Sequence, residues 1–299
     1  MMRRHTAELL LLSVTALWGG TFVLVKGAMQ DTSASLFVLL RFSIALVLAL
    51  LLWPRAVRGW NVLLVRRGLI LGALYGAGFL LQTIGLTMTT ASSSAFITGT
   101  MVAFVPIVHW LVNRAPINAH HIISIIMVLS GLYLFTAPDM HGVNAGDVIT
   151  LLSAAIWALY MTYLDRWTID LRDKPDHQNA LVILQFAATM LLAGIGSMLI
   201  ERDPWHLVWT PSLMMALLYC GIFASVIATW VQTRYQRFTH PVRAGIVFST
   251  EPLFAAIIAW LAAAETFSTR QVLGGIVLVA AVVVPDALAA RRDVVRESV

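Results

Sequence analysis

Ten long apolar segments account for most of the chain and restrict its fold more than any other feature. Each is about 20 residues long, the length that an α-helix needs to cross the hydrocarbon core of a bilayer. Only 12% of the 299 residues are charged, whereas soluble domains have about a quarter. We therefore predict an all-α integral membrane protein with ten transmembrane helices. The predicted helices are Leu9–Met29, Ala34–Trp53, Gly68–Met88, Ser92–Asn113, Ala119–Ala137, Asp147–Asp165, Gln178–Ile200, Pro211–Gln232, Pro241–Ala264 and Ser268–Leu288.

The basic residues are distributed unequally between the two ends of these segments. Of the 20 Lys and Arg residues, 16 precede the first segment, follow an even-numbered segment or close the chain. Two others, Arg202 and Arg270, lie at the opposite ends, and Lys26 and Arg41 lie within segments. Because Lys and Arg accumulate in cytoplasmic loops, this bias favours an even number of helices. It predicts a multi-pass protein of a bacterial inner membrane with both termini in the cytoplasm.

The chain divides near its middle into two similar halves. The stretch Ala137–Asp147 contains no Lys or Arg and has the Pro and Gly content of a loop. Five segments lie on each side, and residues 11–18 resemble residues 151–157, since both begin Leu-Leu-Ser and end on Trp. An odd number of crossings per half reverses the second half in the membrane, so we predict inverted repeats around a central cavity. The predicted units are a first five-helix repeat, 1–137, a periplasmic linker, 138–147, and a second five-helix repeat, 148–299.

Several short motifs resemble one family of membrane proteins. They are Trp18-Gly19-Gly20-Thr21-Phe22 with Lys26, Arg41-Phe42, and Glu251-Pro252 followed by Trp260 and Glu265. In their order and spacing, the chain resembles the EamA branch of the drug/metabolite transporter superfamily, and most of all bacterial exporters of amino acids, including aromatic amino acids. The resemblance implies two inverted five-helix halves around a cavity lined by the first, third, fourth, sixth, eighth and ninth helices. It leaves the fifth and tenth helices as peripheral supports.

Aromatic residues recur at helical spacing on four of the predicted helices. Residues three or four positions apart lie on one face of a helix, so each group forms a stripe. Packing or contact with lipid explains any single ring equally well. Taken together, the stripes lie away from the interfaces where Trp and Tyr usually gather and favour a cavity for a partly apolar solute. The predicted substrate-binding residues from these stripes are Trp18, Phe22, Tyr75, Phe79, Gln82, Trp157 and Tyr160.

Glu251 completes the predicted binding site, because ionisable residues inside a membrane are functional candidates. It lies about halfway along the ninth helix, directly before Pro252. Its carboxylate could accept a proton or hold the ammonium group of a solute. The alternative is a structural role in which it stabilises the helix bend by hydrogen bonding to Ser249 or Thr250.

Other ionisable residues favour structural roles. Lys26 lies one turn from the end of the first helix and favours extension to the membrane surface, with attraction of a solute carboxylate as the alternative. Arg41 lies deeper and favours pairing with backbone carbonyls. His120 and His121 point to different faces with no third ligand nearby in the sequence, so we predict no metal site.

Two prolines are candidates for gating because a proline inside a helix removes a backbone donor and allows a bend. Pro252 is in the ninth helix and Pro106 in the fourth. The position in the fourth helix that matches Pro252 is occupied by Val102, one turn before Pro106. We therefore expect the two gating helices to bend at different depths.

The sequence favours a carrier over the other classes of function. It contains no G-x-S-x-G or H-E-x-x-H motif, so we predict that the protein is not an enzyme. The prediction is an alternating-access transporter that exports small organic metabolites, most of all neutral or aromatic amino acids. The alternatives are an exchanger of phosphorylated or nucleotide-linked solutes, which would need several cations in the cavity, and a channel-like facilitator. We expect a small-molecule substrate and the lipid bilayer as partners, no cofactor, no nucleic acid, and a monomer or homodimer.

Overall fold

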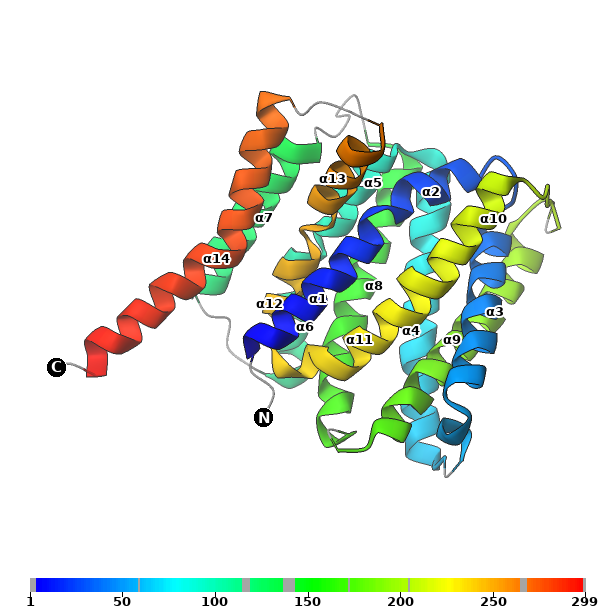
Figure 1. Cartoon of the computed structure of the whole chain (residues 1–299), viewed down its shortest axis with the longest axis horizontal. Helices are drawn as coiled ribbons and strands as arrows, with labels where there is room; N and C mark the ends of the chain where they lie inside the picture. The colour runs from blue at the N-terminus through cyan, green and yellow to red at the C-terminus, as the bar shows by residue number, and fades with distance from the viewer. Residues whose placement is uncertain are drawn as a thin grey trace.

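The structure is a bundle of helices (Figure 1). It is a computed structural model that describes residues 4–58, 60–114, 119–136, 143–171, 173–203, 205–263 and 268–297. Part of the predicted linker 138–147, up to residue 142, and Glu265 of the ninth-helix motif lie outside the described residues. In the described part, eight helical stretches are long and apolar enough to cross a membrane, and the shorter apolar helices His121–Thr136 and Thr269–Val283 occupy the two remaining predicted segments.

Several of these stretches are divided by local interruptions into shorter helices. In chain order the main helices are α1 (Arg4–Gly19), α2 (Thr21–Ala28), α3 (Ala34–Leu52), α4 (Val62–Met88), α5 (Ala91–Gly99), α6 (Met101–Asn113), α7 (Ala119–Thr136), α8 (Ala145–Thr168), α9 (Pro175–Ile200), α10 (Pro211–Leu218), a π-helix (Tyr219–Ile227), α11 (Ala228–Tyr235), α12 (Pro241–Phe248), α13 (Glu251–Ala263) and α14 (Thr269–Glu297). We call the π-helix the π segment. It joins α10 to α11 without a loop, so these three form one long stretch.

Two of the interruptions occupy equivalent positions in the two halves of the chain. The fourth predicted helix is divided at Thr100 and the ninth at Ser249 and Thr250, 150 positions further on. Pro252 is the second residue of α13, where its missing N–H costs no intrahelical hydrogen bond. Pro106 lies inside α6, which continues through it. The expectation that the two helices are interrupted at different depths is therefore wrong.

The two interruptions contact each other directly. The Ser249 hydroxyl donates to the carbonyl oxygen of Gly99 at 3.0 Å and also to that of Gly245 at 2.9 Å. A carbonyl at the end of α5 has no partner within its own helix, so Ser249 satisfies it from the other half of the chain. The breaks in α5–α6 and α12–α13 thus form one junction in the middle of the bundle.

Close approach of helix backbones holds the outer part of the bundle together. On α4, Gly72 faces α9, where a Cβ would lie 2.8 Å from the carbonyl oxygen of Gln185. On α14, a Cβ at Gly274 would lie 2.5 Å from the backbone nitrogen of Phe135 on α7. Small residues drive such packing where both helices are surrounded by apolar groups. Figure 1 shows α7 and α14 side by side at one edge and α3 and α9 at the other.

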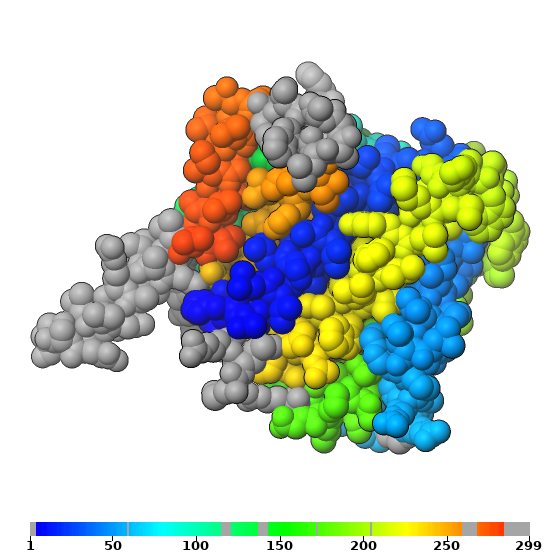
Figure 2. All heavy atoms as spheres, viewed as in Figure 1, coloured from blue at the N-terminus to red at the C-terminus, as the bar shows by residue number. Residues whose placement is uncertain are grey.

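The remaining helices surround the interior between these two edges. In Figure 2, the side chains of α1 lie against those of α11 and the π segment and cover the middle of this face. The outward surfaces carry many exposed Leu, Ile and Val side chains, such as Leu51, Val62 and Leu199. An apolar exterior of this extent fits contact with lipid rather than with water. The polar residues discussed next lie on the inside.

Candidate functional site

A pocket lies between the two halves of the chain, at the level of the helix interruptions. About 470 Å³ of it is free of protein atoms, part of this space being open to solvent, but only about 40 Å³ admits the centre of a water-sized sphere. The rings on its walls therefore fill much of the space, and a bulky solute needs them to move apart. The lining residues are Trp18, Thr21, Arg41, Phe79, Gln82, Thr98, Met101, Trp157, Met161, Gln232, Phe248 and Glu251. None of these twelve residues comes from α7 or α14, which correspond to the fifth and tenth helices that the resemblance left outside the cavity. The second helix, α3, was not expected in the lining but contributes Arg41.

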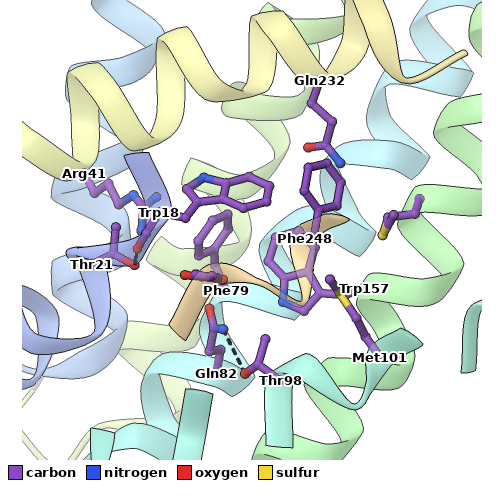
Figure 3. A pocket seen from close by; sticks show the side chains of 12 residues that line it. Trp18, Thr21, Arg41, Phe79, Gln82, Thr98, Met101, Trp157, Gln232 and Phe248 are labelled. Carbon is purple, nitrogen blue, oxygen red and sulfur yellow. Dashed lines mark hydrogen bonds between the residues drawn. The ribbon is translucent and has the colours of Figure 1, made fainter. Parts of the chain in front are cut away.

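Four aromatic rings form the apolar walls of the pocket (Figure 3). The rings of Trp18 and Phe248 lie 5.2 Å apart between centroids, and those of Phe79 and Trp157 lie 4.9 Å apart at an interplanar angle of 89°. Edge-to-face contacts of this kind are favourable for aromatic pairs. The indole N–H of Trp18 donates to the carbonyl oxygen of Ala224 in the π segment at 3.0 Å. Trp18 is therefore held in orientation from the opposite half of the chain.

Arg41 supplies the positive charge of the pocket. Its Nε–H donates to Ser225 Oγ at 2.8 Å, and a terminal N–H makes a longer contact of 3.4 Å with the carbonyl oxygen of Ala224. Its guanidinium carbon lies 4.3 Å from the centroid of the Phe79 ring, a cation–π distance. A guanidinium has five N–H donors, so these contacts leave donors for a ligand. The contact with a backbone carbonyl agrees with the sequence interpretation, which did not place Arg41 in the pocket.

The π segment supplies the groups that hold Trp18 and Arg41. In a π-helix each carbonyl pairs with the N–H five residues further along, instead of four as in an α-helix. Such segments are rare and are frequent at functional sites. Here Ala224 and Ser225 face the pocket region and hold one aromatic and one cationic lining residue. No feature of the sequence predicted this segment.

Glu251 supplies the acidic group of the pocket and begins α13 at the interruption. The positive end of the helix dipole favours an anionic group there. Glu251 does not hydrogen bond to Ser249 or Thr250, as the structural alternative required. The Ser249 hydroxyl bonds instead to the carbonyls of Gly99 and Gly245, and the Thr250 hydroxyl bonds to the carbonyl of Val247. No hydrogen bond or direct ion pair to the Glu251 carboxylate occurs among the described residues. Arg41 is near enough to act on it electrostatically.

Polar side chains occupy two further parts of the lining. Gln82 donates from Nε2 to Thr98 Oγ1 at 3.1 Å, a contact drawn in Figure 3. Gln232 extends from α11 and is almost completely buried. A basic and an acidic side chain, two amides and aromatic walls thus line one pocket. This combination suits a small solute with a charged end and an apolar body.

Five of the eight predicted substrate-binding residues line the pocket, namely Trp18, Phe79, Gln82, Trp157 and Glu251. The other three, Phe22, Tyr75 and Tyr160, do not. Phe22 packs near the far end of the bundle in a separate apolar cluster with Phe37 and Leu86.

Tyr75 and Tyr160 are fully buried behind the lining. The Tyr75 hydroxyl shares a hydrogen bond of 2.5 Å with Thr229, and the Tyr160 hydroxyl donates to Gln185 at 2.8 Å. Tyr75 also packs edge-on against Phe79 and Trp157. Helical spacing correctly placed these tyrosines on the inward side but could not show that other side chains stand between them and the pocket.

The predicted gating prolines also lie outside the lining. Pro106 and Pro252 are buried, one inside α6 and the other in the first turn of α13. Pro252 lies next to Glu251, at the junction of the two interruptions. Motion at either proline stays a prediction.

Lys26 and His121 both lie outside the pocket lining. Lys26 donates from Nζ to the carbonyl oxygens of Leu86 at 2.6 Å and Thr89 at 2.9 Å. It therefore caps the C-terminal end of α4, where a cation is favourable. His121 stacks on His240, with ring centroids 4.9 Å apart. Among the described residues, no group of three or more His, Cys, Asp or Glu has an arrangement suited to a metal ion.

Sequence reasoning also missed several lining residues. Gln232 had a detectable signal, because Thr229, Gln232, Thr233 and Gln236 form a polar stripe at helical spacing at the end of an apolar segment. Thr21, Thr98, Met101, Met161 and Phe248 line the pocket without such a signal. Small hydroxyls and apolar side chains are common on every face of membrane helices, so their type alone did not distinguish them.

The fold and the pocket define a class of protein: an all-helical, multi-pass membrane protein with an internal site of mixed polarity. The model of the EamA-like transporter family matches residues 5–137 and 144–284. The chain therefore belongs to the EamA-like transporter family, within the drug/metabolite transporter superfamily. Membership indicates a transporter and not an enzyme.

Similar proteins agree with this assignment. An uncharacterized transporter of Archaeoglobus fulgidus is 26% identical over 289 residues, covering 95% of this chain and 86% of the relative. The uncharacterized transporter YoaV of Bacillus subtilis is 25% identical over 281 residues, covering 90% of this chain and 92% of the relative. One solved crystal structure has a TM-score of 0.76 at 18% identity and covers 97% of this chain and 99% of its own. At that identity the likeness concerns the fold alone.

Proposed function

We propose that this protein is an alternating-access carrier that exports small organic metabolites, most of all neutral or aromatic amino acids, across a bacterial inner membrane. The observation that carries the proposal is the presence of both Arg41 and Glu251 in the lining of a pocket walled by aromatic rings. An amino acid is a zwitterion with a side chain on one carbon. Its carboxylate complements Arg41, its ammonium complements Glu251, and an apolar side chain complements the rings.

The proposed architecture is ten transmembrane helices in two inverted repeats of five. Three helix contacts support it, because each joins helices of the same rank in the two halves: α3 with α9, α6 with α12, and α7 with α14. The interruptions at Thr100 and Thr250 are also related by the offset between the halves. The start of α1 and the end of α14 lie toward the same end of the bundle in Figure 1, in agreement with two cytoplasmic termini.

Alternating access requires the two halves to rock against each other around the pocket. The junction between Gly99 and Ser249 is a suitable pivot, and Pro106 and Pro252 flank it on α6 and α13. Cross-linking the fourth helix to the ninth at their outer ends should stop transport. Undiminished transport by the cross-linked protein would contradict the gating proposal.

The lining disfavours the alternative of a phosphorylated or nucleotide-linked solute. Such an anion needs several cations, and Arg41 is the only basic residue among the twelve that line the pocket. Lys26 is engaged at the end of α4. A channel-like facilitator is disfavoured by the narrow pocket, which the aromatic rings nearly close.

The function is tested by a panel of radiolabelled amino acids supplied to purified protein in proteoliposomes. We expect uptake of apolar and aromatic amino acids and little uptake of sugar phosphates. Glu251→Gln removes the negative charge while conserving the shape of the side chain. We expect at least about tenfold slower transport of zwitterions, since a hydrogen bond to a charged group contributes about 1.5–3 kcal/mol. Unchanged transport by Glu251→Gln at every pH would contradict the assigned role.

A further inference from the structure

A chain of amide hydrogen bonds fixes the orientation of Gln232 at the pocket. Gln236 Nε2 donates to the carbonyl oxygen of Met161 at 2.8 Å, so its Oε1 is left as an acceptor. Gln232 Nε2 donates to that Oε1 at 2.9 Å. The oxygen and nitrogen of a glutamine amide are assigned from such networks. Here the backbone carbonyl of Met161 can only accept, so it fixes which end of Gln236 is the nitrogen, and Gln236 in turn fixes the orientation of Gln232. The oxygen of Gln232, not its nitrogen, therefore remains unused.

The unused oxygen is buried and belongs to the pocket wall. Gln232 is 1% exposed, and no protein group hydrogen bonds to its Oε1. Figure 3 shows its amide extending from α11 into the pocket, on the side of Phe248 and away from Gln82. A second lining residue also has a buried polar atom without a hydrogen-bond partner in the protein, the indole Nε1–H of Trp157. Buried polar atoms in proteins nearly always have a partner, so two unpaired ones in one pocket indicate polar atoms on the ligand.

We propose that Gln232 is a specificity-determining residue whose Oε1 accepts a hydrogen bond from a donor on the far end of the solute. The inference rests on the proposed function, because it deepens the substrate class of the same site. Arg41 and Glu251 hold the zwitterionic end, the rings of Phe79 and Phe248 lie along the body, and Gln232 contacts the distal end. The preferred solute is then an amino acid with a long apolar or aromatic side chain that ends in a hydroxyl or N–H group.

A purely structural role does not account for the free oxygen. The bond from Gln236, which directly follows α11, to Met161 already joins this part of the chain to α8 without Gln232. The structural contribution of Gln232 is the hydrogen bond that its Nε2 donates to Gln236 Oε1, and this bond does not use Gln232 Oε1. A site that uses such an acceptor rejects the analogue that lacks the donor more strongly than an apolar pocket discriminates between sizes.

The experiment compares L-tyrosine and L-phenylalanine, which differ only in the distal hydroxyl, as substrates in proteoliposomes. We expect the wild type to transport tyrosine at least about tenfold more efficiently, as kcat/KM, because loss of one buried hydrogen bond leaves an acceptor unpaired. In Gln232→Met the ratio should fall toward one. Gln232→Glu, which keeps an acceptor, should retain a preference for tyrosine. Gln236→Met, which frees the amide to rotate, should give an intermediate ratio.

Gln185→Met is the matched control, because Gln185 is a buried glutamine of α9 outside the pocket lining. It should leave the ratio unchanged. A wild type that transports both amino acids equally overturns the inference, as does an unchanged ratio in Gln232→Met, and both results leave the carrier proposal intact. A wild type that transports neither overturns the proposed function and the inference with it. The wild-type ratio decides the matter even where a variant fails to fold.

Discussion

The third and eighth predicted helices occupy equivalent places in the two halves but are built differently. The third is α4, a continuous α-helix whose glycines bring it against α8 and α9. The eighth consists of α10, the π segment and α11, and its backbone holds two pocket residues, Trp18 and Arg41. One half thus offers a close-packed wall and the other a polar, irregular helix. The difference teaches that the site is asymmetric even though the halves resemble each other.

The two tryptophans at the pocket show the same asymmetry. Trp18 on α1 donates its indole N–H to Ala224 of the π segment. Trp157 on α8 packs its ring against Gly78 of α4, where a Cβ would lie 3.0 Å from the ring, and its N–H has no protein partner. We infer that Trp18 is fixed by the protein, whereas Trp157 keeps a donor for the ligand.

The largest expected effect comes from breaking the contact between Arg41 and the π segment. Arg41→Met removes the hydrogen bond to Ser225, the positive charge of the pocket and the cation–π contact with Phe79. Transport of zwitterionic amino acids, as kcat/KM in proteoliposomes, should fall about a hundredfold, since one charged hydrogen bond contributes about 1.5–3 kcal/mol. Arg41→Lys should transport little better than Arg41→Met, because an ammonium lacks the planar arrangement of N–H donors of a guanidinium. Full activity of Arg41→Lys would contradict this role.

A smaller effect is expected from disturbing the wall formed by α4. A Cβ in Gly72→Ala would lie 2.8 Å from backbone atoms of Gln185, so we expect about 2 kcal/mol of destabilisation, as for overpacked cores. Gly221→Ala in the π segment should cost less, because its nearest neighbour is a methyl group of Ile44 at 3.1 Å. Gly27→Ala is the control, with no atom within 4 Å of its Cβ. The free energy of unfolding in detergent is measured for all three variants. Equal destabilisation by Gly72→Ala and Gly221→Ala would contradict the proposed difference in packing between the two helices.

The smallest effect separates the two tryptophans. Trp18→Phe loses the hydrogen bond to Ala224 and should lower the free energy of unfolding by about 1 kcal/mol more than Trp157→Phe does, because a net hydrogen bond contributes about that much. Trp157→Phe loses no protein hydrogen bond and should instead weaken solute binding. Unfolding in detergent and binding of L-tyrosine measured on the same two variants make the comparison. A larger loss of stability in Trp157→Phe than in Trp18→Phe would contradict the assignment of Trp18 to a protein hydrogen bond and of Trp157 to the ligand.

The helices were predictable because the bilayer imposes length and hydropathy on each crossing. The break in the ninth helix was marked by Pro252, which lies in the first turn of α13. The break in the fourth helix was not marked, since Thr100 has no composition that indicates a break and Pro106 lies further along, inside α6. The π segment had no signal at all, because its residues are as apolar as those of any spanning helix.

The site was predictable where a residue type is costly in a membrane or where spacing places it inward. Glu251 and Trp18 were found for these reasons. Spacing gives the face of a helix but not the depth of packing behind it, so Tyr75 and Tyr160 could not be distinguished from Phe79. Gln232 was overlooked although its polar stripe was visible, since a stripe near a helix end also suits the membrane surface.

The most direct test of the account is counterflow of L-tyrosine in proteoliposomes that contain the purified protein. A pocket shared by the two halves and opened to one side at a time binds its solute, so unlabelled tyrosine inside the vesicles should accelerate uptake of labelled tyrosine. The uptake should saturate and should favour the L-enantiomer. Flux that rises linearly with concentration and ignores internal tyrosine and its stereochemistry would contradict the account.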